Sequence, residues 1–197
     1  MADSQTAYLM ENEEQPSGQV LDAVIGLGAN LASPELALQT ARSALGQLGD
    51  LSACSSIYRT LPVGGPLQPD YLNAAVRLRF QGSPQALLAS LLEIERAAGR
   101  ERRERWGPRN LDLDILWIKD RRVDAPGLQV PHARLRERAF ALLPLLEVAP
   151  EATDPSDGTE YKEALRELDL AGVLEVRHSW VGADLRDVPP GMDRPRP

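Results

Sequence analysis

The stretch RWGPRNLDLDILWI (residues 105–118) combines a Gly-Pro turn between two arginines with an alternation of aspartates and apolar residues. In an extended strand the side chains at i and i+2 point to the same face, so Asp112 and Asp114 lie side by side, about 6.6 Å apart along the backbone. The same alternation places Leu116 and Ile118 on the aspartate face. The opposite face is apolar throughout: Leu111, Leu113, Ile115 and Trp117. The stretch therefore predicts a central strand, covered on both sides, with two carboxylates where it begins.

The carboxylate pair needs a positive charge beside it, because two like charges on one strand face repel each other. Magnesium suits this pair, since hard divalent cations take carboxylate oxygens and complete their shell with water and substrate phosphates. The arginines just upstream would then face the same phosphates. The structural alternative is that one aspartate caps a turn and the other pairs with Arg105 or Arg109. We favour the magnesium site because the sequence Arg-Trp-Gly-Pro-Arg precedes the aspartates.

The composition predicts one soluble globular domain. The chain has 197 residues, 43% of them hydrophobic, which is enough for a single core. No apolar run approaches the roughly 18 residues that span a bilayer, and the acidic N-terminal stretch lacks the positive region of a signal peptide. Cys54 is the only cysteine, which fits a reducing cytoplasm. A net charge of -7 argues against broad binding to nucleic acid or anionic membranes, and we expect a cytoplasmic monomer.

The apolar patterning predicts an α+β fold. The expected elements, in order, are a strand at 23–28, a helix at 34–48, strands at 51–59 and 71–80, a helix at 84–98 and the strand at 111–118. This β-α-β-β-α-β order is that of a ferredoxin-like antiparallel sheet with helices on one face. Such a sheet leaves its other face partly open for a ligand.

The parts of the chain outside this pattern carry further expectations. Beyond the aspartate strand we expect a short strand near Val123, an apolar helix at 140–146, and a turn-and-helix cap at 153–176. The predicted domain organisation is a disordered extension at 1–19, a single domain at 20–179, and a proline-rich disordered tail at 180–197.

Three further features carry weaker predictions. Gly26-x-Gly28 ends the predicted strand at 23–28, but the third glycine of the dinucleotide-binding fingerprint is missing. The loop at 60–69 is rich in proline and glycine, which is typical of a mobile or functional loop. His132 lies after a proline among polar residues, where it could contact a phosphate, although a lone histidine is more often a surface side chain.

Several separated motifs together resemble the 6-hydroxymethyl-7,8-dihydropterin pyrophosphokinase family (2-amino-4-hydroxy-6-hydroxymethyldihydropteridine diphosphokinase) of folate biosynthesis. The motifs are YRT at 58–60, DYLNAA at 70–75, RWGPR with DLDI at 105–115, and VPH at 130–132. The resemblance runs from about residue 23 to about residue 152. It implies an enzyme that transfers diphosphate from ATP to the pterin hydroxymethyl group and releases AMP.

The resemblance also assigns residues to the parts of the site. In the family the two aspartates, here Asp112 and Asp114, hold two magnesium ions that bridge the ATP phosphates. The implied catalytic residues are Arg100, Arg109, Asp112 and Asp114. The implied ATP contacts are Glu95, Trp106, Arg109, Ile115, His132 and Arg138. The implied pterin contacts are Thr60, Val63, Tyr71, Asn73 and Phe140.

Two places depart from the family pattern. The segment between Arg100 and Trp106 is one residue shorter than in the family form, so either Arg102 or Arg103 is the catalytic-loop arginine. Ala133 stands where an aromatic residue often follows the histidine.

Two other classes of protein share parts of this pattern. A two-metal nucleotidyltransferase or cyclase also places Asp-x-Asp on a ferredoxin-like sheet, but it needs no clamp of Tyr71, Asn73 and Phe140. A non-catalytic module that binds RNA on an open sheet face would carry several aromatic residues on adjacent strands beside basic residues. The sequence disfavours that module, because the chain is acidic and has only two phenylalanines.

Overall fold

The fold is described from a computed structural model, which covers residues 19–62, 66–99, 109–177 and 180. Most of the expected N-terminal extension and C-terminal tail therefore lies outside the described residues. The elements in chain order are β1 (Val20–Ala29), α1 (Pro34–Leu48), β2 (Gly49–Cys54), β3 (Ile57–Thr60), β4 (Tyr71–Gln81), α2 (Pro84–Ala97), β5 (Asp112–Ile118), β6 (Val123–Ala125), β7 (Leu128–Val130), the 3-10 helix η1 (Leu135–Glu137), α3 (Ala139–Val148), α4 (Tyr161–Arg166) and β8 (Val173–Arg177).

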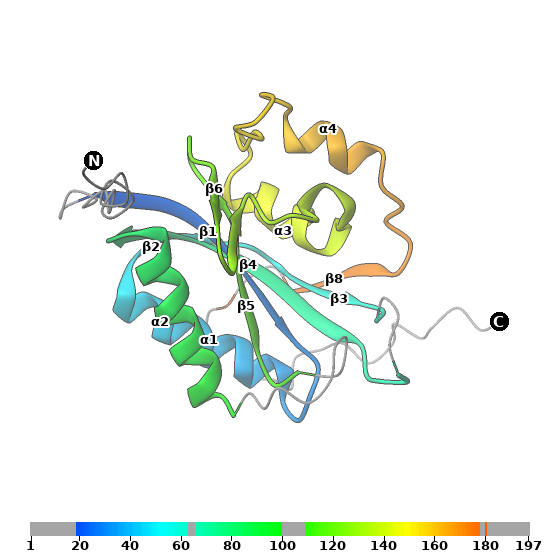
Figure 1. The fold of residues 1–197 in the computed structure, drawn as a ribbon. Coiled ribbons are helices and arrows are strands. Elements are labelled where there is room, and N and C mark those ends of the chain that lie inside the picture. The colour runs from blue at the N-terminus through cyan, green and yellow to red at the C-terminus, as the bar shows by residue number, and fades with distance from the viewer. Residues whose placement is uncertain (1–18, 63–65, 100–108, 178–179, 181–197) are drawn as a thin grey trace, which may run out of the picture.

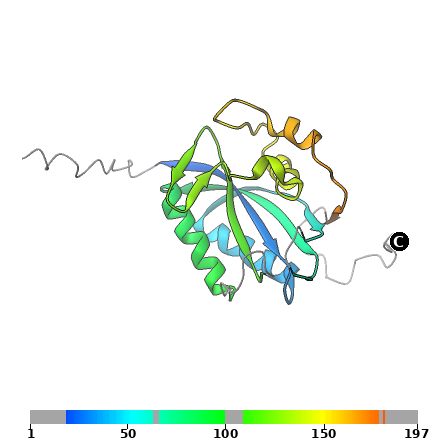
Figure 2. The same cartoon turned by 45° about the vertical axis from the view of Figure 1, so that its right-hand side comes forward.

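The main sheet is antiparallel and six-stranded, in the order β5-β1-β4-β3-β8, with β2 also paired to β4. The predicted α+β, ferredoxin-like β-α-β-β-α-β pattern is confirmed. α1 and α2 lie on one face of this sheet (Figure 1). Figure 2 shows α3 and α4 on the opposite face, with the β6-β7 hairpin beyond the end of β5.

The predicted strand at 51–59 is in fact two strands, β2 and β3, which both pair with β4. Ser55 lies between them, and its hydroxyl accepts a hydrogen bond from the N–H of Ala75 at 2.8 Å. Its own N–H donates to the carbonyl of Ala75 at 2.9 Å. The hydroxyl of Ser55 thus takes the place of a backbone carbonyl. The chain can therefore shift its register on β4 while the N–H of Ala75 keeps a hydrogen-bond partner.

The face that carries α1 and α2 holds a continuous apolar core. Alternate residues of β1 and β4 point into it, as the period of two requires. The helices contribute Leu38, Ala41 and Leu45 from α1 and Leu87 and Leu91 from α2, all fully buried. Ser83 begins α2 by accepting a hydrogen bond from the N–H of Ala86, with Pro84 at the first helical position.

The second face is covered by α3, but the strand with the aspartates does not keep the expected alternation. A β-bulge interrupts the β1-β5 register where Val24 pairs with Trp117 and Ile25 with Ile115, so Leu116 is the extra residue. Trp117 therefore packs with Leu116 against α3, while Ile118 joins the α1 and α2 core. The predicted faces of Trp117 and Ile118 were wrong, because the bulge reverses the side-chain direction after Leu116.

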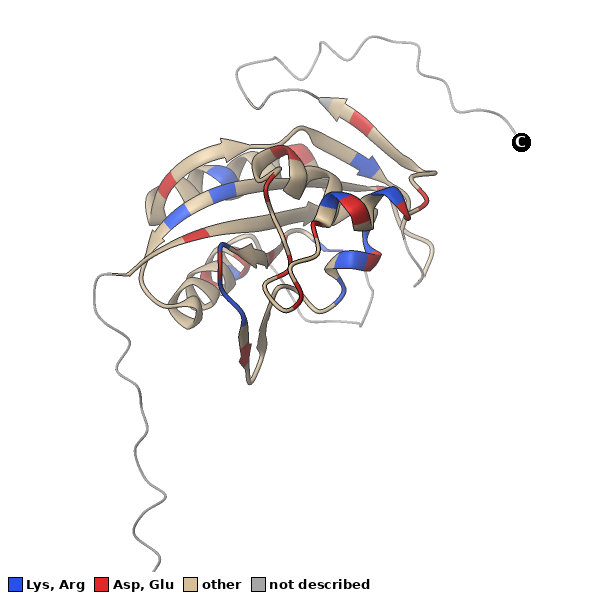
Figure 3. Cartoon of the chain, turned by 90° about the horizontal axis from the view of Figure 1, so that it is seen from above, with Lys and Arg blue, Asp and Glu red and all other residues tan. Residues whose placement is uncertain are grey.

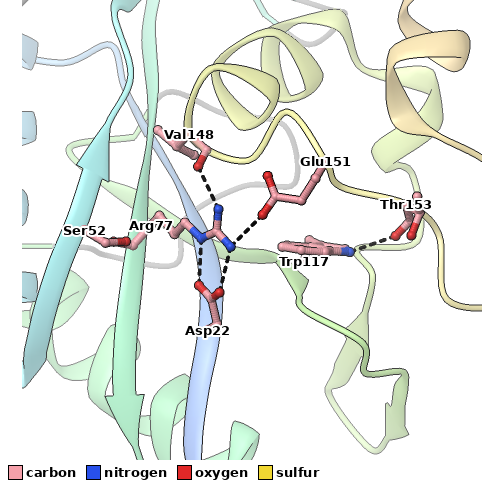
Figure 4. Close-up of polar contacts among 7 residues, drawn as sticks. All are labelled: Asp22, Ser52, Arg77, Trp117, Val148, Glu151 and Thr153. Atoms are coloured by element: carbon pink, nitrogen blue, oxygen red, sulfur yellow. Dashed lines mark hydrogen bonds and ion pairs between the residues drawn. The ribbon is translucent and has the colours of Figure 1, made fainter.

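A polar network holds the end of α3 and the chain that follows it against the sheet (Figure 4). Arg77 of β4 donates two hydrogen bonds to Asp22 of β1, at 2.8 and 2.7 Å. The same guanidinium donates to the carbonyl of Val148 at 3.3 Å and pairs with Glu151 at 2.7 Å. Its neighbour Trp117 donates from Nε1 to the carbonyl of Thr153 at 2.8 Å. The guanidinium of Arg77 therefore joins β1 to the end of α3 and the residues that follow it.

The C-terminal part of the domain differs from its prediction in two ways. Residues 173–177 form β8, an edge strand on β3, where we expected only a turn-and-helix cap. Trp180, expected to begin the tail, is 9% exposed and donates from Nε1 to the carbonyl of Ser55 at 2.7 Å. The guanidinium of Arg42 on α1 lies 5.9 Å from the centroid of its ring. The packed core therefore includes residue 180.

The surface charges are mixed. Figure 3 shows acidic and basic segments interspersed along the described ribbon, with no broad basic face on the side in view. Among the described helices, none is both long enough and apolar enough to cross a membrane.

Candidate active site

A cavity of about 710 Å³ opens on the α3 face of the sheet, where β1 ends and β5 begins. Gly26 and Gly28 of β1 form its floor. A β carbon on Gly28 would lie 3.3 Å from Oδ1 of Asn73, and one on Gly26 would lie 3.0 Å from the side chain of Leu116. Because β1 lies between β5 and β4, these two glycines keep open the space between the aspartates and Asn73.

The backbone register arranges the groups around this floor. Gly28 pairs with Asp112 on one side and Asn73 on the other, so the three residues lie in one row across the sheet. Gly26 pairs with Asp114 in the next row. The i, i+2 spacing of the aspartates therefore does place both carboxylates on the cavity face, and both line the cavity.

The two aspartates differ in their surroundings. Asp112 forms an ion pair and hydrogen bond with Nη1 of Arg109, three residues earlier. Asp114 lies deeper, and burial together with the charge of Asp112 raises the pKa of its carboxyl group. The positive charges of His132, Arg138 and Arg109 act in the opposite direction on that pKa, but they are weaker. This end of the cavity would therefore be stabilised by an added cation.

A cluster of basic groups reaches the cavity from the chain that leads into α3. His132 follows the cis peptide bond between Val130 and Pro131, and its N–H donates to the carbonyl of Leu116 at 2.9 Å. Burial lowers the pKa of its imidazole, and the opposing effect of Asp114 is smaller. Nδ1 accepts a hydrogen bond from the N–H of Arg134 at 3.2 Å, so in the neutral ring the proton is on Nε2.

The opposite part of the cavity carries aromatic and amide groups. Asn73 is buried and donates from Nδ2 to Oγ1 of Thr60 at 2.8 Å, which fixes its amide between β4 and β3. Tyr71 also lines the cavity, and burial raises the pKa of its hydroxyl group. Phe140 enters from the first turn of α3, and the guanidinium of Arg138 lies 5.7 Å from the centroid of its ring. The cavity thus combines a polar, charged end with flat apolar surfaces and a fixed amide.

Most of the residues named from the sequence line this one cavity. Those found there are Thr60, Tyr71, Asn73, Arg109, Asp112, Asp114, His132, Arg138 and Phe140. Val63, Arg100 and Trp106 lie outside the described residues, as do Arg102 and Arg103. The departure at Ala133 does fall on the cavity wall.

Two of the named residues do not line the cavity. Ile115 points into the core under α1 and α2. Glu95 of α2 is 1% exposed and accepts a hydrogen bond from the N–H of Leu113 at 2.7 Å. The prediction of a central strand was wrong in this respect, because β5 is at the edge of the main sheet and pairs there only with β1. Glu95 of α2 therefore bonds a backbone N–H on the open edge of β5.

Comparison of the sequence with known proteins identifies the family of this chain. A family model described as 7,8-dihydro-6-hydroxymethylpterin-pyrophosphokinase (HPPK) matches residues 24–150. The chain belongs to the HPPK family. A 2-amino-4-hydroxy-6-hydroxymethyldihydropteridine pyrophosphokinase from Synechocystis sp. is 41% identical over 156 residues, covering 78% of this chain and 80% of that protein. A Pseudomonas aeruginosa protein of the same name is 40% identical over 151 residues, covering 76% of this chain and 93% of that one.

Solved structures agree on the HPPK fold. The crystal structure of wild-type Plasmodium falciparum HPPK-DHPS with pterin and p-hydroxybenzoate matches with a TM-score of 0.61 at 15% identity, over 77% of this chain and 42% of that one. The same protein with pteroate gives a TM-score of 0.61 at 13% identity, over 77% of this chain and 43% of that one. This chain therefore spans less than half of the Plasmodium protein, and at such identities the likeness concerns the fold.

Sequence reasoning missed two contributions to the HPPK cavity. The first is the pair of glycines in β1, which the sequence analysis treated only as an incomplete dinucleotide fingerprint. The available clue was their position inside a strand, where glycine often marks the close approach of a ligand. The second is the segment that leads into β8: Asp169, Ala171, Gly172 and Val173, the first residue of β8, also line the cavity. This segment lies beyond the region that matches the HPPK family model, and no motif marks it.

Proposed function

We propose that this chain transfers diphosphate from ATP to the hydroxymethyl group of 6-hydroxymethyl-7,8-dihydropterin and releases AMP, as a step of folate biosynthesis. One observation carries the proposal. In a single cavity, residues of the HPPK-matched region bring together a carboxylate pair, a fixed amide and two aromatic rings. The carboxylate end suits an anionic polyphosphate with its cation, and the amide and rings suit a flat heterocycle.

The pterin would lie between the rings of Tyr71 and Phe140. The amide of Asn73, held by Thr60, would pair with the hydrogen-bonding edge of the heterocycle. Main-chain groups of Thr60 and Val63 would complete this recognition, as the family resemblance implies. Because Asn73 is fixed before binding, little side-chain entropy is lost when the pterin binds.

The phosphates would lie against Asp112 and Asp114 through magnesium. The donor set fits that ion: two carboxylates on one strand face share a site with no third acidic, histidine or cysteine ligand among the described residues, and magnesium usually leaves the remaining positions to water and phosphate. When bound, two such ions would neutralise charge on the phosphates during in-line displacement. Arg109 would hold Asp112 in place and contribute its own positive charge at the same end.

The nucleotide would extend from this end toward His132 and Arg138, which line the adjoining wall. Ile115 would contribute only through its backbone on the β5 edge, because its side chain is in the core. Glu95 would act by fixing that edge. Arg100 and Trp106 complete the proposed site on the strength of the family resemblance. We also propose that the enzyme works as a cytoplasmic monomer without nucleic acid or membrane.

Product analysis tests the proposed reaction. The purified protein is mixed with magnesium, ATP and 6-hydroxymethyl-7,8-dihydropterin, and AMP and the pterin diphosphate are quantified by chromatography. We expect the two products to form in equal amounts and to require the pterin and magnesium. Release of diphosphate from ATP without pterin would instead identify a nucleotidyltransferase or cyclase, and binding of both substrates without turnover would contradict the catalytic assignment.

A further inference from the structure

Asn30, the residue after β1, ties together three segments that surround the cavity. Its Oδ1 accepts a hydrogen bond from the N–H of Arg109 at 2.8 Å, and its own N–H donates to the carbonyl of Arg109 at 3.1 Å. Its Nδ2 donates to Oε1 of Gln68 and to the carbonyl of Pro69, both at 3.0 Å. The side chain is 3% exposed, so the amide of Asn30 is buried with both of its ends bonded.

The contacts of Asn30 continue in both directions. Oε1 of Gln68 also accepts a hydrogen bond from the hydroxyl of Tyr71 at 3.2 Å. On the other side, the side chain of Arg109 pairs with Asp112. A connected path therefore runs from Asp112 through Arg109, Asn30 and Gln68 to Tyr71. Its two ends are the proposed phosphate side and the proposed pterin side of the cavity.

Only a carboxamide would reproduce these contacts, and glutamine would carry it on a chain that is one carbon longer. An amide offers one acceptor and two donors from the same group, and here the acceptor faces an N–H while the donors face two oxygens. Aspartate would place a second acceptor against the oxygens of Gln68 and Pro69, and alanine would leave the N–H of Arg109 without this partner. Each change would make the position of the pterin side of the cavity less fixed relative to the phosphate side.

We propose that Asn30 is a positioning residue, which couples the pterin side of the site to the phosphate side so that each substrate improves the binding of the other. This inference rests on the proposed function. Asn30 touches neither proposed substrate position directly, since it does not line the cavity. Its effect is on the relative placement of Tyr71 and Arg109. Thermodynamic linkage requires the coupling to be reciprocal: the factor by which nucleotide tightens pterin binding equals the factor by which pterin tightens nucleotide binding.

Calorimetric titration measures this coupling. The probes are 6-hydroxymethylpterin and the magnesium complex of α,β-methylene-ATP. In this analogue a carbon replaces the oxygen between the α- and β-phosphorus atoms, so the bond that the reaction would break cannot be cleaved. Each is titrated alone and in the presence of the other, with the wild-type protein and with Asn30→Ala. We expect Asn30→Ala to remove about tenfold of coupling while changing the affinity for each probe alone by less than about threefold.

Two further variants make the result specific. Gln68→Leu breaks the same path one step later, so the double variant Asn30→Ala/Gln68→Leu should lose no more coupling than either single variant. Asn110→Ala is the matched control, because this neighbouring amide donates to the carbonyl of Gly99 and not to the path. Its coupling should equal that of the wild type. Circular dichroism and thermal unfolding establish that each variant is folded.

The outcomes separate the inference from the proposed function. Wild-type coupling in a folded Asn30→Ala variant would overturn the positioning role, and so would equal weakening of both probes with the coupling factor unchanged. Because Gln68 is only partly buried, a folded Gln68→Leu variant decides the same question if Asn30→Ala does not fold. Failure of the wild-type protein to bind the pterin at all would overturn the proposed function itself.

Discussion

The two faces of the central sheet are built from the same strands but have different roles. On the face under α1 and α2, β1 presents only apolar residues: Leu21, Ala23, Ile25, Leu27 and Ala29. On the other face, after the exposed Val20, the same strand presents Asp22, Val24, Gly26 and Gly28. These are a charge, an apolar residue and two positions without a side chain. The first face is packed along its whole length, whereas the second is packed by α3 only in its middle, with an ion network at one end and the cavity at the other.

This difference shows how one strand separates stability from function. Because side chains alternate, a strand can fill one face with hydrocarbon and leave the other face free for polar groups. Substitutions on the first face should therefore change the free energy of unfolding with little effect on turnover per folded molecule. Substitutions around the cavity should do the reverse.

The strongest test of this separation is Asp114→Asn. We expect turnover to fall by about a thousandfold or more, because the amide cannot replace the carboxylate that would hold the cation. The melting temperature should rise, since burial and Asp112 both disfavour the charged form of Asp114. Initial rates and thermal unfolding measure the two effects. Asp112→Asn is the control: it should also lose turnover but should not gain stability, because it gives up the pairing with Arg109. Near-normal turnover in both variants would contradict the assignment of the carboxylate pair.

On the packed face, Leu91→Ala should lower the free energy of unfolding by about 2–5 kcal/mol, because it creates a cavity at a position with 0% exposure. The value of kcat per folded molecule should not change. Urea unfolding and steady-state kinetics measure the two quantities. Leu36→Ala, at 58% exposure on α1, is the matched control and should change stability by less than about 0.5 kcal/mol. A large loss of kcat in folded Leu91→Ala would show that the two faces are not independent.

At the far end of the cavity face, Arg77→Leu should cost about 2 kcal/mol, since it removes several charge-assisted hydrogen bonds. The variant should also lose the part of the pH dependence of stability that comes from the Asp22–Arg77 pair. Arg77 holds the pKa of Asp22 below its ordinary value, so this contribution to stability is present above about pH 4 and is lost as the pH falls through the lower pKa of the folded protein. Urea unfolding between about pH 2 and pH 7 measures it.

The matched control for Arg77 is Arg96→Leu, which removes an exposed ion pair with Glu93. It should change stability by less than about 1 kcal/mol and leave the acid limb of the wild-type profile in place. If Arg77→Leu kept the same acid dependence as the wild type, Asp22 would not be its source.

The smallest expected effect is at the cavity floor. Gly28→Ala should weaken pterin binding by about tenfold, because its β carbon would lie 3.3 Å from Oδ1 of Asn73 and push the amide from its place. Gly46→Ala, inside α1, is the control: its β carbon would make only an ordinary contact with Leu51 at 3.5 Å, and the helix should gain about 0.5–1 kcal/mol. Fluorescence titration and thermal unfolding distinguish the two. Unchanged pterin affinity in Gly28→Ala would contradict the assignment of Gly28 to the floor of the pterin site.

Local patterns in the sequence predicted much of the fold because they report local physics. Ser83 and Pro84 mark the beginning of α2 by capping chemistry, and the observed helix begins at Pro84. The spacing of Asp112 and Asp114 predicted two carboxylates on one face, and both line the cavity. Comparison with a known family supplied the residues that spacing alone cannot assign, such as Tyr71, Asn73 and Phe140.

The errors occurred where a residue's partner lies far away in the sequence. The bulge at Leu116 depends on the register of β5 against β1, and it reversed the predicted faces of Trp117 and Ile118. The interruption at Ser55 depends on a bond to Ala75 of β4. β8 shows no clear alternation because it is an edge strand with exposed Leu174 and Val176, and only pairing with β3 defines it.

The sequence by itself determined the order of the elements, the buried face of each helix and the carboxylate pair, since each follows from the periodicity and caps of a short segment. The tertiary structure alone decided that Gly26 and Gly28 would form a cavity floor, that the segment before β8 would close its wall, and that Asn30 would connect its two sides. The physical reason is that strand register and loop closure are set by contacts between residues distant in the chain, and such contacts leave no periodic trace in the sequence.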